Sequence, residues 1–185
     1  MRKFTSSILA GALALSAFAT VAYAANPMVG GAPMPADKNI VENAVNSKDH
    51  TTLVAAVKAA GLVETLQGAG PFTVFAPTNE AFAALPAGTV ETLLKPENKD
   101  KLTKILTCHV VGAEAFSKDI MKMVDDDKGA HPVKTVGGCT WTAKYEGGKV
   151  TVTDENGNVA NVTIADVDQS NGVIHVIDKV LLPKM

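Results

Sequence analysis

The chain has 185 residues, of which 46% are hydrophobic and 19% are charged, and its formal net charge is −2. This length fits one ordinary domain with a substantial core. The mildly acidic balance and the lack of any Lys and Arg cluster argue against nucleic acid as a partner, because phosphate binding needs clustered basic side chains.

The first 24 residues have the layout of a secretory signal peptide, so residues 1–24 are predicted to be removed on export. Arg2 and Lys3 precede an uncharged apolar run, and Ala22 and Ala24 place small residues where a signal peptidase reads. The apolar run is shorter than the roughly 20 residues that span a bilayer. We therefore expect cleavage after Ala24 and a secreted or periplasmic location.

The mature chain would hold 185 − 24 = 161 residues. Losing two basic residues would take its formal charge from −2 to −4. It contains no second apolar stretch long enough to span a membrane, so no membrane span is expected in the mature chain. Residues 25–36 are rich in Pro, Gly, Ala and Met, which predicts a flexible leader before the domain at 37–185.

The first half of the domain is predicted to be largely helical. Apolar residues recur at three- and four-residue steps over 39–66, and Gly61 is placed to end a helix. A short β-rich run follows at 72–75, and Thr78 is a good N-cap for a helix over 79–85. Further expected segments are helices over 88–94 and 97–106, a strand at 110–111 and an amphipathic stretch over 114–128.

The second half has the character of β-strands. Gly-rich turns at 146–148 and 155–158 are strong hairpin signals, because their residues tolerate positive φ. Helices first and antiparallel strands later predict the α+β class. The expected strands are 133–136, 140–145, 149–153, 159–164 and 173–182.

No arrangement of residues typical of an enzyme is present, and we expect neither catalysis nor a cofactor. Cys108 and His109 are neighbours in an expected strand, where adjacent side chains point to opposite faces and do not form a thiol–imidazole pair. His109 and His175 lie in apolar β-like runs. They could be a pair of metal ligands, but no carboxylate stands at ligand-like spacing, which favours structural roles bridging backbone groups.

The two cysteines, Cys108 and Cys139, are predicted to form a disulfide, since an even count in an exported chain favours pairing. They are separated by 139 − 108 = 31 positions. The alternative is a pair of buried free thiols.

Two blocks of the chain resemble the signature blocks of fasciclin (FAS1) domains. The first, 70–82, contains Phe75, Pro77, Thr78 and Phe82; the second, 171–183, contains Asn171, Gly172, His175 and Asp178. Between them, residues 106–111 resemble the family's Tyr-His strand, with Cys108 where the family has Tyr, followed by His109.

The resemblance covers about residues 37–183 and implies the FAS1 fold. In that fold, helices mainly from the N-terminal half pack on an antiparallel sheet built mainly from the C-terminal half. The motif residues are then mainly fold elements. Asp166 and Val167 match an Asp-Ile pair that is linked to integrin contact in animal members. They are a weak candidate for partner binding, and the alternative is a strand end followed by a turn.

The resemblance implies an adhesion or interaction module that binds an envelope or matrix protein or polysaccharide outside the cytoplasm. The alternative is a periplasmic carrier of a small molecule or metal, which a ligand pocket under the sheet would favour. Aromatic residues are scarce, with Trp141 the single tryptophan. A large carbohydrate-stacking platform is therefore not obvious.

Overall fold

The computed structural model describes residues 26–184, and the signal peptide predicted over 1–24 lies outside them. Within the described part, no helix combines the length and the apolar character needed to cross a membrane. The helical elements are α1 (Ile40–Ala44), η1 (Lys48–His50), α2 (Thr51–Ala60), α3 (Val63–Gln67), α4 (Asn79–Ala83), α5 (Thr89–Leu93), η2 (Pro96–Asn98), α6 (Lys99–Cys108) and α7 (Ser117–Asp126).

The strands form a two-stranded hairpin and a seven-stranded sheet. They are β1 (Met28–Val29), β2 (Ala32–Pro33), β3 (Phe72–Pro77), β4 (Val110–Val111), β5 (His131–Lys134), β6 (Thr140–Glu146), β7 (Lys149–Thr153), β8 (Val159–Gln169) and β9 (Gly172–Ile177). The order in the large sheet is β4-β3-β9-β8-β7-β6-β5. Only β3 and β9 are parallel, and the other neighbours in this sheet are antiparallel. The α+β class is confirmed.

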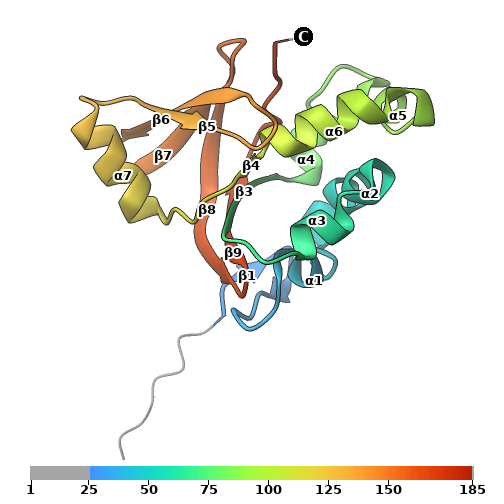
Figure 1. Ribbon diagram of the computed structural model, residues 1–185, viewed down its shortest axis with the longest axis horizontal. Helices are drawn as coiled ribbons and strands as arrows, with labels where there is room; N and C mark the ends of the chain where they lie inside the picture. Colours follow the sequence, from blue (N-terminus) through green and yellow to red (C-terminus); the bar gives the residue numbers. More distant parts are fainter. Residues whose placement is uncertain (1–25, 185) are drawn as a thin grey trace, which may run out of the picture.

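Helices lie on both faces of the sheet, which therefore separates two apolar cores (Figure 1). One core joins α1, α2, α3, α4 and α6 to one face of β3 and β9, and the other joins α7 to β6, β7 and β8. Strand β9 serves both, because Ile174 belongs to the first core and Ile177 to the second. All six residues of β9 are buried, as expected for a strand in the middle of a sheet.

Local sequence signals set several element ends as predicted. Thr78 caps α4 by accepting a hydrogen bond from the Ala81 N–H at 3.3 Å. Gly61 ends α2 in the left-handed conformation, with φ of 72°. Gly147 and Gly148, both at positive φ, form the two-residue turn between β6 and β7.

The prediction of a flexible leader over 25–36 is wrong for most of that segment. Met28–Val29 and Ala32–Pro33 pair as a small hairpin around Gly30 and Gly31, which both adopt positive φ. Val29 and Met34 are each 2% exposed and belong to the core on the side of α1 and α2. The composition of the segment indicated a linker, but Val29 and Met34 pack into the core and so order the segment.

Two further boundaries differ from the sequence prediction. Cys108 is the last residue of α6 and His109 is its C-cap, so neither is in a strand. The helix continues because Ile105, Leu106 and Cys108 remain on its buried side. The strand expected over 173–182 stops at Ile177, where the Asp178 carboxylate binds the backbone N–H and side-chain amide of Asn161.

Candidate functional site

An open hollow of about 410 Å³ lies between the two edge strands of the large sheet. One wall is formed by Val111 at the end of β4 and by residues 113–115, and the other by β5 at 131–134. Phe75, Ile120 and Met123 form its apolar lining from the sheet and from α7. This is a surface depression with an apolar base, and its walls carry both charged and backbone polar groups.

The hollow exists because the two sheet edges meet at one end and then separate. The Val136 N–H donates to the Val110 carbonyl at 2.8 Å, and the Gly137 N–H donates to the Thr107 carbonyl at 3.0 Å. Beyond this contact β4 and β5 are not paired with each other. The sheet therefore closes toward a barrel at residues 136–137 and opens at residues 131–134.

His175 supports the base of the hollow from below. Its ring stacks on Phe75, with ring centroids 5.7 Å apart. Its Nε2–H donates to the Ala115 carbonyl at 2.8 Å, while its Nδ1 accepts the Asp166 N–H at 3.3 Å. Burial lowers the pKa of His175 despite the opposing effect of the Ala115 bond. The imidazole is neutral and holds the 113–115 wall against the sheet.

The structure changes the interpretation of Asp166 and Val167 as a partner-binding pair. Val167 is fully buried in the core and is not available to a partner. Asp166 lies at an irregularity of β8 with φ of 58°, and its carboxylate accepts hydrogen bonds from the Ser117 backbone N–H and hydroxyl. A carboxylate at a helix N-terminus is favourable. Asp166 therefore ties β8 to the start of α7, which forms part of the hollow.

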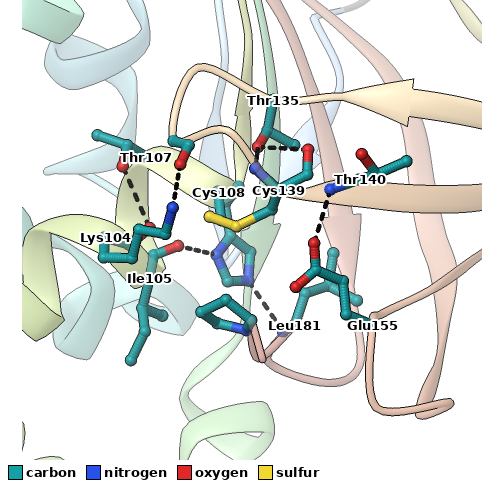
Figure 2. Close-up of a disulfide and its surroundings, with 12 residues drawn as sticks. Lys104, Ile105, Thr107, Cys108, Thr135, Cys139, Thr140, Glu155 and Leu181 are labelled. Atoms are coloured by element: carbon teal, nitrogen blue, oxygen red, sulfur yellow. Dashed lines mark hydrogen bonds between the residues drawn. A yellow bond between two sulfur atoms is a disulfide. The ribbon is translucent and has the colours of Figure 1, made fainter. Parts of the chain in front are cut away.

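A disulfide joins Cys108 at the end of α6 to Cys139 just before β6 (Figure 2). The two Cα atoms are 5.5 Å apart, within the range that a disulfide requires. Close by, the Trp141 indole N–H donates to the Cys108 carbonyl, and Trp141 is fully buried. This cluster connects the helical half of the domain to the strand half.

His109 occupies a fixed position beside the disulfide. Its Nδ1 lies 2.8 Å from the Ile105 carbonyl and its Nε2 accepts the Leu181 N–H at 3.0 Å. The carbonyl needs a proton on Nδ1, and the Leu181 N–H needs a lone pair on Nε2, so the ring is the neutral Nδ1–H tautomer. Burial lowers its pKa to about 4. His109 has no nitrogen free for metal binding or proton transfer.

Acidification is therefore expected to destabilise the protein between pH 6.5 and about 4. The unfolded state takes up a proton on His109 near the ordinary value of 6.5, whereas the folded state does so only near pH 4. The stabilisation from neutral His109 is present above pH 6.5 and falls by about 3 kcal/mol toward pH 4. Burial also lowers the pKa values of His50 and His175, so protonation of these two side chains adds to the loss of stability in acid.

Urea unfolding at a series of pH values measures this loss. The control is His109→Gln, which cannot titrate and should show a flatter profile over the same interval. An equally steep profile in that variant would assign the acid sensitivity to other groups.

The remaining residues of the two resemblance blocks hold elements together. Asn171 accepts the Ile40 N–H and donates to the Leu66 and Gly68 carbonyls, so it joins α1, the end of α3 and β9. A Cβ at Gly172 would collide with the Phe72 carbonyl of the adjacent strand. Phe75, Pro77 and Phe82 are buried in the two cores or at their boundary.

Within residues 26–184, no three His, Cys, Asp or Glu side chains are grouped closely enough to hold a metal ion. The Nδ1 of His131 lies 2.7 Å from a carboxylate oxygen of Asp127, the residue that follows α7. His109 and His175 each use both ring nitrogens on backbone groups, so they do not form the metal pair considered from the sequence.

Sequence reasoning missed the walls of the hollow. Pro132 and Lys134 alternate with His131 and Val133, and a proline with an exposed lysine two positions later is typical of an edge strand. That signal was present, but nothing local showed which other edge β5 would face. Glu114, on the opposite wall, precedes α7 and carried no signal of its own.

Comparison with known proteins places the fold. The family model for the fasciclin domain matches residues 48–183. The chain belongs to the fasciclin family. A FAS1 domain pair from the insect cell adhesion molecule fasciclin I has the same fold, with a TM-score of 0.70 at 21% identity over 78% of this chain and 51% of that one. The FAS1 fold predicted from sequence is confirmed.

Relatives of this fasciclin domain occur in bacteria and animals. Protein sll1483 of Synechocystis sp. is 56% identical over 146 residues, covering 79% of this chain and 74% of the relative. Immunogenic protein MPB70 of Mycobacterium bovis is 35% identical over 76% of this chain and 66% of its own. Transforming growth factor-beta-induced protein ig-h3 of Sus scrofa is 40% identical over 71% of this chain but only 17% of its own length.

Proposed function

We propose that this fasciclin domain is an exported, non-catalytic interaction module that binds a protein or polysaccharide of the cell envelope or matrix. The observation that carries the proposal is the 410 Å³ hollow between the edges of the sheet, which opens to solvent over an apolar base. The hollow is an open depression along a strand edge, a form that suits an extended polymer. The description of fasciclin I as a cell adhesion molecule supports the same class of function.

The absence of catalysis in this proposal rests on the groups that the sequence singled out. Cys108 is in a disulfide, and both nitrogens of His109 are engaged with backbone groups. Neither is available as a nucleophile or a base. Screening of the purified protein against esterase, glycosidase, phosphatase and peptidase substrates should show no turnover. An activity lost on replacing His109 would contradict the proposal.

A carrier of small molecules or metals has less support. The two apolar cavities beneath α1 and α2 hold about 40 and 30 Å³, and spaces of this size accept a water molecule but no organic ligand. The larger hollows at 87–101 and beside 179–182, of about 360 and 300 Å³, are open to solvent. Native mass spectrometry of the purified protein checks this point, and a stoichiometric bound mass would favour the carrier function.

Export is the cellular part of the proposal and rests on the signal-peptide layout of residues 1–24. The intact mass of the exported protein should equal that of a chain that begins at Ala25. A cytoplasmic chain that retains Met1 would contradict it. A mature chain outside the cytoplasm would meet its partner in the envelope or beyond it.

The binding function is tested by capture of envelope components on the immobilised protein. Extract treated with protease or with glycan-degrading enzymes distinguishes the two partner classes, because only the relevant treatment removes the captured material. The proposal predicts saturable capture that soluble protein competes. Capture equal to that of an unrelated acidic protein would contradict it.

A further inference from the structure

The β5 wall of the hollow is an unpaired strand edge. In β5, the Thr135 N–H donates to the Cys139 carbonyl, and the same register continues through Val133 opposite Trp141. Because hydrogen-bonded pairs alternate with non-bonded pairs in an antiparallel ladder, the backbone groups of Pro132 and Lys134 face away from β6. Within residues 26–184, the Lys134 N–H and carbonyl have no strand partner.

The opposite wall is paired at its closed end. The Phe75 N–H donates to the His109 carbonyl, and Thr73 lies opposite Val111, so the backbone groups of Val110 face outward. The Val110 carbonyl accepts from the Val136 N–H, which closes the sheet at that end. Strand β4 ends at Val111 and a bend follows, so the free strand edge at the hollow is β5.

The side chains around this edge suit an extended peptide. The half-buried Met123 and Val133 provide accessible apolar surface beside the β5 edge, above the buried Phe75 and Ile120. Glu114 and Lys134 stand on opposite walls, both are exposed, and neither forms a salt bridge within residues 26–184. In a strand, alternate side chains point to opposite faces, so a peptide could bury apolar side chains against the base and direct charged ones to the walls.

A polysaccharide matches this surface less well. Sugars bind to exposed aromatic faces, and the only aromatic carbon ring in the lining is Phe75, which is 1% exposed and stacked on His175. The free groups are instead backbone donors and acceptors in strand geometry. These groups are matched by the main chain of another polypeptide.

We propose that the partner is a polypeptide that binds as an added β-strand along the β5 edge, with an apolar side chain against the half-buried Met123 and Val133. This proposal rests on the interaction function proposed above and specifies the class of partner. Main-chain hydrogen bonds to Lys134 and Pro132 would provide affinity. Glu114 and Lys134 would favour a segment with a basic residue near one wall and an acidic residue near the other.

The test selects random linear peptides on the purified protein and compares two variants at one position. Lys134→Pro removes the N–H that the proposal uses, and that N–H has no bond to lose in the free protein. Lys134→Ala keeps that N–H and removes the charge together with the rest of the side chain. Selected peptides should bind Lys134→Pro about tenfold more weakly than wild type, and bind Lys134→Ala with a smaller loss. Equal binding by all three proteins would overturn the proposal.

A second readout does not depend on how the proline variant folds. N-methylation of each peptide N–H in turn should weaken binding at every second position, because only alternate amides face the β5 edge. Loss without this period, or no enrichment of peptides at all, would overturn strand addition.

The capture experiment separates this proposal from the binding function. If Lys134→Pro retains all of the captured envelope material, or if glycan digestion removes it, the interaction function stands and strand addition is wrong. If wild type captures nothing, the interaction function itself is wrong.

Discussion

Trp141→Ala should lower the free energy of unfolding by about 3–5 kcal/mol, the range for deleting a buried large aromatic side chain. Trp141 is fully buried in the core under α7, and its indole N–H donates to the Cys108 carbonyl. The substitution removes apolar contacts, creates a cavity and leaves that carbonyl without its donor. Urea unfolding followed by circular dichroism measures the loss.

Trp141→Phe is the matched control, because it keeps an aromatic ring and removes the N–H. It should cost less, about 1–3 kcal/mol, mainly from the unsatisfied carbonyl and imperfect filling. A loss below about 0.5 kcal/mol for Trp141→Ala would mean that the core between α7 and the sheet is not packed as described.

Replacing Cys108 and Cys139 together with alanine should cost about 3–4 kcal/mol, provided the disulfide is formed in the exported protein. The bond closes a loop with a sequence separation of 31 residues, and the chain-entropy estimate for such a loop gives this range. Alanine is chosen because both positions are buried and a serine hydroxyl there would need a partner. Denaturant unfolding of the oxidised wild type and the double variant gives the difference.

Thiol counting tests the premise of that prediction. The denatured, unreduced exported protein should have no free thiol, and finding two would contradict the disulfide. Because Trp141 binds the Cys108 carbonyl, its loss and the loss of the disulfide should not be additive when combined. Additivity within about 0.3 kcal/mol would mean that the two features stabilise the fold independently.

The fold was accessible from sequence because its signals are local or contained in long blocks. Thr78, Gly61 and the Gly147-Gly148 turn act through their own backbone neighbours, and each was recognised. The two long blocks then indicated the FAS1 fold, in which their residues are mainly fold elements. The helical end at Cys108 was missed because an apolar run with a histidine reads equally well as a strand.

The site depended on contacts that no local pattern specifies. Val29 and Met34 are buried because α1 and α2 leave space for them, which composition alone does not reveal. Asp166 binds Ser117 across 49 positions of sequence, and Val167 turns into the core beside it. The hollow itself arises from the divergence of β4 and β5, the two ends of a sheet whose order does not follow the chain.

Amide hydrogen exchange of the purified protein, with and without solubilised envelope extract, tests most directly that the hollow is the binding site. The account predicts slower exchange in residues 111–116 and 131–134 when extract is present, with α2 unchanged. Protection of α2 and α3 with no change at either edge would contradict it, because binding would then take place on the helical side of the domain.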